Sequence, residues 1–177
     1  MRSQTSKDIA RTLAMLGMPE ATFEIEVADT GELMASGCDK IRFMFSANKN
    51  MAPQPVEKIA SGGEISRVML ALKALLAKKA KLPTIIFDEI DTGVSGRIAD
   101  AMGEIIRSLS ENMQVVAITH LPQVASKGEA HFVVYKQDSR TNISRLGDDD
   151  RITEIAKMLS GSEISDAARK QAKILLG

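Results

Sequence analysis

Two adjacent carboxylates, Asp88 and Glu89, directly follow the apolar run Thr-Ile-Ile-Phe at 84–87. Such a β-branched and aromatic run is typical of a strand buried on both faces, and open α/β sheets bind ligands at the carboxyl ends of their strands. On an extended chain adjacent side chains point in different directions. One carboxylate could then hold Mg²⁺ while the other orients and deprotonates a water. The alternative is a strand that runs into a solvated polar loop.

The segment Ser61-Gly62-Gly63-Glu64 precedes a strongly amphipathic stretch. Two glycines permit close backbone approach, and the start of a helix offers unpaired N–H groups to an anion. Ser61 could donate its hydroxyl to a phosphate oxygen. A flexible loop in which Ser61 only caps the helix is the competing interpretation.

His120 ends the apolar run at 115–119, and Asp91-Thr92-Gly93 joins the Asp88 strand to the next helical stretch. If both runs are parallel strands, His120 shares a sheet edge with Asp88 and could contact a terminal phosphate. A lone histidine is more often structural, and Asp91 could equally cap a turn. The phosphate-binding pattern G-x-x-x-x-G-K-[ST] is absent from the sequence, so a nucleotide site would be incomplete here.

Hydrophobic periodicity predicts the elements that position these residues. We expect strands at 23–28, 41–47, 84–87, 115–119, 130–136 and 141–147. We expect helices at 2–17, from 61, from 95, from 122, from 148 and at 163–175, with residues 48–55 as a loop. The early strands are expected to be antiparallel and peripheral. Strand–helix alternation between 60 and 120 favours a parallel α/β core.

The first helix has Ile9, Leu13 and Leu16 on one stripe, and Gly17 and Pro19 end it. By pattern alone, a terminal helix packed on the core is favoured over the stump of a longer coiled coil. On the helix from 61, the expected buried stripe consists of Ile65, Val68, Met69, Leu72, Leu75 and Leu76.

Composition places the chain among soluble intracellular proteins. Its 177 residues have zero formal net charge and 3% aromatic residues, which disfavours base-stacking platforms and a whole-chain nucleic-acid footprint. A single cysteine, Cys38, excludes an internal disulfide framework. Neither a membrane-spanning run nor a signal-peptide pattern is present.

The order of the motifs resembles ABC-type ATPase heads: ASGGE at 60–64 (signature), TIIFDE at 84–89 (Walker B with its catalytic Glu), DTG at 91–93 (D-loop) and ITH at 118–120 (switch histidine). Glu64, where ABC transporters usually have Gln, points to the SMC-like branch, and Ala60 departs from the usual leucine. The segments LGMP, FSANKN, IASGGEISRVMLALK, DEIDTGVSGR and ITHLPQVA extend the resemblance, over nearly the whole chain, to the C-terminal part of the RecN family of DNA repair proteins.

This resemblance implies an ABC/SMC-type P-loop NTPase head lobe, with parallel core strands, peripheral antiparallel strands and flanking helices. Asp88 would hold Mg²⁺, Glu89 the attacking water, and His120 the γ-phosphate of ATP. Ser61, Gly62, Gly63 and Glu64 would contact ATP on a second head, and Asp91 would lie at that interface and couple the two sites. The implied partners are an N-terminal lobe carrying Walker A, a second head in an ATP-dependent homodimer, and DNA, with no membrane.

Residues 1–19 would be the root of a returning coiled-coil helix, with Met1 a start or cloning residue, and 20–177 the C-terminal head lobe. The resemblance thus reverses the preference that the helical pattern gave. The chain alone would not hydrolyse ATP, and the intact protein would be cytoplasmic and associated with the bacterial nucleoid.

Two other classes of function remain open. A metal-dependent nuclease could gather Asp88, Glu89, Asp91 and His120 around one or two ions, although the glycines at 62 and 63 would then have no role. A non-catalytic interaction module could retain these motifs as relics.

Overall fold

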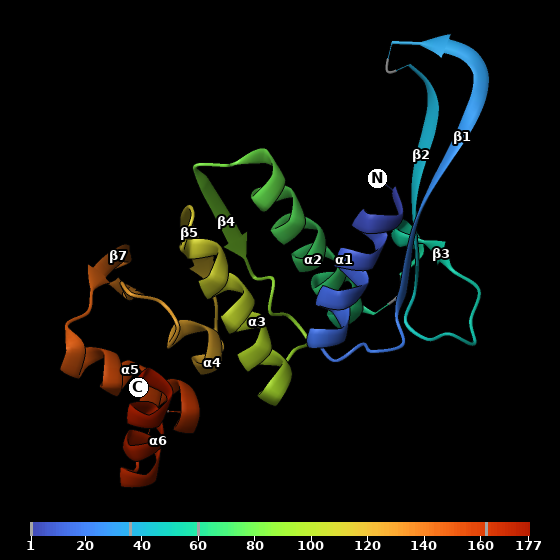
Figure 1. Ribbon diagram of the computed structural model, residues 1–177. Coiled ribbons are helices and arrows are strands. Elements are labelled where there is room, and N and C mark those ends of the chain that lie inside the picture. The colour runs from blue at the N-terminus through green and yellow to red at the C-terminus, as the bar shows by residue number, and fades with distance from the viewer. Residues whose placement is uncertain (1, 36, 60, 162) are drawn as a thin grey trace. The chain divides into compact units, whose positions relative to one another are not determined.

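The computed structural model describes residues 2–35, 37–59, 61–161 and 163–177 (Figure 1). The chain forms two compact units, Met1–Leu82 with Thr92–Val94 (unit 1) and Pro83–Asp91 with Ser95–Gly177 (unit 2). The polypeptide therefore passes from unit 2 into unit 1 after Asp91 and returns before Ser95.

Unit 1 contains α1 (Arg2–Met15), β1 (Thr22–Met34), β2 (Gly37–Ser46), β3 (Gln54–Pro55), the 3-10 turn η1 (Val56–Lys58) and α2 (Gly62–Ala80). β1, β2 and β3 form an antiparallel sheet in that order. Residues 48–55 were expected to be a loop throughout, but Gln54 and Pro55 pair with the end of β2.

The predicted stripe of α1 is buried: Ile9, Leu13 and Leu16 are at most 1% exposed. The helix ends as its sequence predicts. Gly17 has φ 80°, its N–H donates to the Ala14 carbonyl, and the Met18 N–H donates to the Leu13 carbonyl at 2.9 Å. This is the glycine-terminated pattern that satisfies the last carbonyls of a helix.

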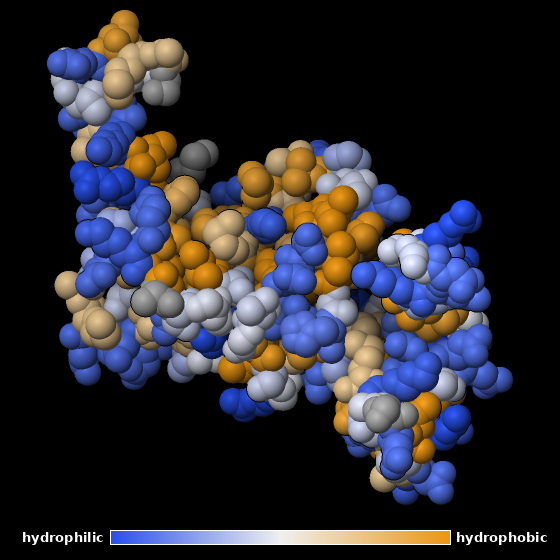
Figure 2. Space-filling model, turned by 180° about the vertical axis from the view of Figure 1, so that it is seen from behind, coloured by the Kyte–Doolittle hydropathy of each residue, from blue (hydrophilic) through white to orange (hydrophobic). Residues whose placement is uncertain are grey.

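β1 and β2 form a long hairpin that projects beyond α1 and α2 (Figure 1). Phe23 and Phe45 are partners at its base and are buried, whereas Ile41, on the same face farther out, is 60% exposed. Apolar side chains also gather at the outer end of this hairpin (Figure 2), where Leu33 and Met34 lie. The hairpin is therefore anchored at one end only.

The buried stripe of α2 differs from the expected one. Met69 and Leu76 are exposed, because the neighbouring elements cover a face that includes small residues. The buried residues of α2 are Val68, Leu70, Ala71, Ala74 and Ala77. Val68 and Ala71 join α1 and the hairpin base in one cluster: Ile9, Leu13, Met18, Ala21, Phe23 and Phe45 complete it. This cluster is the core that fixes the start of α2.

Unit 2 contains β4 (Thr84–Asp88), α3 (Gly96–Ser110), β5 (Gln114–Ile118), α4 (Pro122–Ala125), β6 (Phe132–Gln137), β7 (Arg140–Arg145), α5 (Asp148–Ser160) and α6 (Asp166–Leu176). β4 and β5 are parallel and in register from Thr84↔Gln114 to Asp88↔Ile118. The parallel core, the peripheral antiparallel strands and the flanking helices are therefore confirmed.

β4 is buried on one face, not on both as its apolar run predicts. Phe87 is fully buried, but Ile86 is 58% exposed, and Val116 and Ile118 beside it on β5 are also exposed. α3 has an apolar stripe in which Met102, Ile105, Ile106 and Leu109 are buried. Among the described residues of unit 2, nothing buries the face formed by Ile86, Val116 and Ile118 (the apolar sheet face).

The strands predicted at 130–136 and 141–147 correspond to β6 and β7, which form a hairpin with a tight turn at Asp138 and Ser139, both at positive φ (49° and 62°). This backbone matches the twist of two-residue hairpins. α5 begins with the three acidic residues that favour a helix start, and it packs on α6. No described helix is both long and apolar enough to cross a membrane.

Candidate functional site

The carboxyl edge of the parallel pair collects the predicted polar residues of unit 2. Asp88 is the last residue of β4 and is paired with Ile118, and the Glu89 N–H donates to the Ile118 carbonyl at 3.3 Å. His120 follows two residues later. Asp88, Glu89 and His120 are all exposed. The sheet thus brings these three side chains to one accessible edge, as the sequence predicts.

Glu89 corrects one detail of that prediction. Its backbone has φ 47°, so the chain is not extended at the second carboxylate. The left-handed region is costly for a residue with a Cβ, and such conformations persist where the surroundings fix them. The strand ends at Asp88, and the chain turns sharply at Glu89. The backbone therefore runs in different directions at the two carboxylates.

Asp91 is placed differently from its exposed neighbours. Its side chain is 1% exposed, whereas Thr92 and Gly93 are exposed. Its Oδ2 accepts hydrogen bonds from the Thr119 hydroxyl and from the His120 N–H, the latter at 3.3 Å. Its Oδ1 lies 3.4 Å from His120 Nδ1. The expected role of Asp91 at an interface stays a prediction, and the carboxylate has its partners within unit 2.

Ser61 and its neighbours lie at the first turn of α2 in unit 1. Ser61 is the N-cap, and its Oγ accepts from the Glu64 N–H at 3.4 Å. Capping uses the hydroxyl as an acceptor, so the hydroxyl hydrogen is left to donate. The capping and the anion-binding interpretations are therefore compatible. Ala60 lies outside the described residues.

The two glycines of this turn have different surroundings. A Cβ on Gly62 would meet nothing within 4 Å, whereas a Cβ on Gly63 would lie 3.0 Å from the carbonyl oxygen of Gly93. Gly93 has φ 73° and approaches the Gly63 backbone from the segment Thr92–Val94. Gly62 is thus open to a ligand, and Gly63 is packed against the loop that follows Asp91.

Arg67 is a residue that the sequence analysis missed. Its Nε donates to the Gly63 carbonyl at 2.8 Å, and one terminal nitrogen donates to the Leu16 carbonyl at 3.2 Å. A cation that binds the last carbonyls of one helix and the first turn of another joins the two. The only sequence signal was a basic residue at helical spacing from Gly63.

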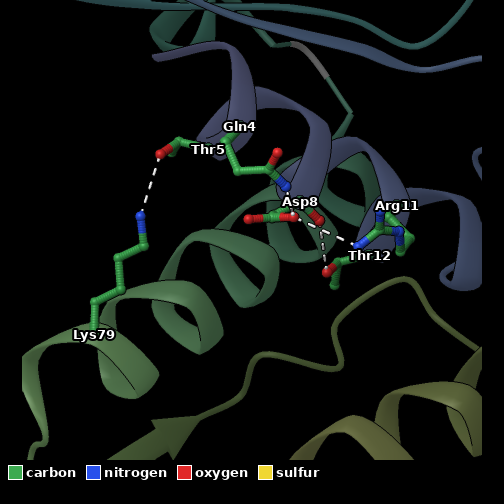
Figure 3. Close-up of polar contacts among 6 residues, drawn as sticks. All are labelled: Gln4, Thr5, Asp8, Arg11, Thr12 and Lys79. Atoms are coloured by element: carbon green, nitrogen blue, oxygen red, sulfur yellow. Dashed lines mark hydrogen bonds and ion pairs between the residues drawn. The ribbon is translucent and has the colours of Figure 1, made fainter. Parts of the chain in front are cut away.

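Polar contacts run along α1, and one of them reaches Lys79 in the last turn of α2 (Figure 3). Asp8 accepts from Gln4 at 2.8 Å and lies 3.5 Å from Arg11, and Lys79 of α2 donates to Thr5 at 3.4 Å. Exposed pairs of this kind stabilise a helix only slightly. α1 is therefore held mainly by its buried stripe and by Arg67.

Lys127, two residues after α4, forms ion pairs with α3. The Nζ of Lys127 lies 2.6 Å from Glu104 and 3.1 Å from Asp100. The hydrogen bond to Glu104, helped by Asp100, raises the pKa of Lys127 above its usual value, so it stays charged. This contact holds the segment that continues from His120.

Among the described residues, no group of three or more His, Cys, Asp or Glu is arranged to hold a metal ion. Asp91 is buried and its Oδ2 accepts from Thr119 and His120, whereas Asp88 and Glu89 are exposed.

Comparison with known proteins gives the family. No protein-family model matches the chain. The DNA repair protein RecN of Rickettsia bellii is 45% identical over 168 residues, which cover 93% of this chain and 30% of that protein. RecN of Haemophilus influenzae is 37% identical over 179 residues, covering 98% and 32%.

The chain belongs to the RecN family. It corresponds to the C-terminal part of those proteins and spans about a third of the length of the curated relatives it matches.

Solved structures show the same fold at low identity. An Smc head domain with a coiled coil and joint from Pyrococcus yayanosii has TM-score 0.73 and 16% identity, over 88% of this chain and 29% of that one. A chain described with the ATP-driven dimerization and DNA-stimulated activation of SMC ATPases has TM-score 0.66 and 17% identity, over 90% and 93%. The fold is therefore that of an SMC-type head lobe.

Proposed function

We propose that this chain is the C-terminal half of an ATP-hydrolysing head in a RecN-family protein that repairs DNA double-strand breaks. The observation that carries the proposal is the shared carboxyl edge of β4 and β5, where Asp88, Glu89 and His120 come together. Family membership and the SMC-type fold support it.

In the head's own site, Glu89 orients and deprotonates the attacking water and His120 contacts the γ-phosphate of ATP. Asp88 suits Mg²⁺, because it offers an exposed carboxylate and Mg²⁺ binds through one or two carboxylates together with waters and phosphate oxygens. When bound, Mg²⁺ would neutralise charge on the phosphates.

The start of α2 serves a second head. Ser61 donates its hydroxyl to the γ-phosphate of ATP held by the partner head, and the open backbone at Gly62 permits close approach of the phosphate. Gly63 and Glu64 complete this turn, and Asp91 with its loop couples the two sites. ATP thus joins two heads in a homodimer, and hydrolysis separates them by removing the phosphate that Ser61 contacts.

An N-terminal lobe of the same protein completes the nucleotide site. The sequence has no Walker A pattern, and the apolar sheet face is unburied within unit 2. Burying this face against another lobe is favourable. The chain alone is therefore expected not to hydrolyse ATP.

Residues 1–19 are, in this proposal, the root of a returning coiled coil, and 20–177 form the head lobe. α1, whose stripe is buried and whose end is bound to the α2 start through Arg67, would then connect the coiled coil to the head lobe. The intact protein would act on DNA in the bacterial cytoplasm, at the nucleoid.

The test is Glu89→Gln in the intact protein with both lobes. ATP turnover should fall by roughly 10²–10⁴-fold, because the base is lost, while ATP-dependent head association, followed by analytical ultracentrifugation, persists. Glu111→Gln, an exposed residue just before β5, is the control and should retain wild-type turnover. The 177-residue chain should show no turnover in the same assay.

Turnover at the wild-type rate in Glu89→Gln would remove Glu89 as the base. An intact protein without any ATPase activity would favour the non-catalytic interaction module instead.

A further inference from the structure

Asp91 is the one acidic side chain among the described residues that is buried, at 1% exposure. A buried carboxylate is costly unless hydrogen bonds compensate its charge. Its neighbours Thr92 and Gly93 are exposed, so the loop itself does not force this burial. The bonds that Asp91 makes explain why it is turned inward.

Oδ2 of Asp91 holds the turn between β5 and α4. It accepts from the Thr119 hydroxyl and from the His120 N–H, and the Leu121 N–H donates in turn to Thr119 Oγ1 at 3.0 Å. Thr119 and His120 are thereby bonded to one carboxylate oxygen, and Leu121 is bonded to Thr119. The backbone of His120 cannot move without breaking these bonds.

Oδ1 of Asp91 is enclosed and accepts no hydrogen bond from the described residues, yet it lies 3.4 Å from Nδ1 of His120. An acceptor next to a ring nitrogen favours the tautomer with hydrogen on that nitrogen. The His120 side chain is 68% exposed. With the hydrogen on Nδ1, the ring nitrogen next to Asp91, Nε2 is the ring nitrogen left for a ligand.

We propose that Asp91 is a positioning residue for His120: Oδ2 fixes its backbone, and Oδ1 selects the Nδ1–H tautomer and so presents Nε2 as the acting atom. The catalytic consequence rests on the proposed contact of His120 with the γ-phosphate. The positioning itself concerns this chain alone.

Asp91→Asn tests the proposal in the 177-residue chain. The amide oxygen would replace Oδ2 and take its two donors, so the amide NH₂ would be directed at Nδ1. A donor there should invert the tautomer to Nε2–H. Long-range ¹H–¹⁵N spectra at mildly alkaline pH report the tautomer, and the chain has only two histidines to assign.

His131 is the internal reference, since it should keep its spectrum in both proteins if the fold is retained. Asp138→Asn, in the exposed β6–β7 turn, is the matched control and should leave His120 unchanged. Nδ1–H in the wild type and Nε2–H in Asp91→Asn support the proposal. The same His120 tautomer in both proteins overturns it.

The consequence for catalysis is measured in the intact protein with both head lobes. Asp91→Asn should lower kcat roughly 10²-fold with little change in KM for ATP, because misplacing a catalytic group has about that effect. Added to His120→Ala, it should cause no further loss if it acts through His120. An inverted tautomer with unchanged kcat would keep the positioning but remove His120 from the proposed function.

Discussion

The start of α2 and the carboxyl edge of β4 and β5 differ in what they are made of. At the α2 start, the polar groups are backbone N–H groups and one hydroxyl from a continuous segment. At the sheet edge, they are ionisable side chains from two strands, and Asp91 is bonded to the turn that carries His120. A backbone site needs open space, whereas a side-chain site needs fixed orientation.

The difference extends to the cores behind the two sites. The α2 start rests on the cluster around Ile9, Leu13 and Val68 in unit 1. The sheet edge follows directly after Phe87, which is fully buried in unit 2. A substitution in the core of one unit should therefore affect the site of that unit more than the site of the other. The stability of the two units can be compared within one chain.

The largest expected effect comes from Phe87→Ala. Losing a fully buried aromatic side chain should lower the free energy of unfolding of unit 2 by about 3–5 kcal/mol. Ile86→Ala, the neighbouring residue on the apolar sheet face, should change it by less than about 1 kcal/mol. Hydrogen exchange followed by mass spectrometry separates the units: the loss of protection should be confined to unit 2. Equal effects of the two substitutions would contradict the one-sided burial of β4.

Gly63→Ala and Gly62→Ala test whether the α2 start depends on space at both glycines. A Cβ at Gly63 would press on the Gly93 backbone, and overpacking of this kind costs about 1–3 kcal/mol. Gly62→Ala meets nothing and should be neutral or stabilise the helix by up to about 1 kcal/mol. Thermal unfolding of the chain, followed by circular dichroism, gives both values. A destabilised Gly62→Ala with an unaffected Gly63→Ala would reverse the roles assigned here.

Local features of this chain were predictable from its sequence. The stripe Ile9–Leu13–Leu16, its end at Gly17 and the Ser61 cap each depend on residues a few positions apart. The common edge of β4 and β5 was also predictable, because apolar runs alternating with helices imply parallel strands.

Contacts between distant segments could not be predicted from the sequence. The bonds from Asp91 to Thr119 and His120, from Arg67 to Leu16, and the packing of Gly63 on Gly93 all depend on the tertiary fold. The two-sided burial predicted for β4 failed because an apolar run does not say whether its second cover lies in the same chain. The exposed Met69 and Leu76 on α2 teach the same point: apolar periodicity alone does not identify the covered side.

The smallest expected effect is a pH dependence of the stability of unit 2, caused by His131. Burial removes the His131 imidazole from water and lowers its pKa below the ordinary 6.5; Arg151 acts in the same direction and Glu154 against it. The unfolded chain therefore binds this proton more readily. The contribution of His131 to the free energy of unfolding should be constant above about pH 7.5. It should decrease as the pH falls through about 6.5, the unfolded-state pKa, and level off below the folded-state pKa. His131→Gln should flatten this fall, measured as the change in Tm between about pH 8 and pH 5.

Gln137→Ala, at an exposed residue of β6 that does not titrate, is the control for that measurement. Because carboxylates titrate in every variant, only the difference from the wild type counts. The acid-sensitive part should appear as lost exchange protection in unit 2, where β6 begins, and not at the α2 start, whose cap and glycines carry no ionisable side chain between 61 and 63. If His131→Gln leaves the pH profile of Tm unchanged, burial of His131 does not contribute to the stability of unit 2. The two units would then differ in stability only through the packing of their cores.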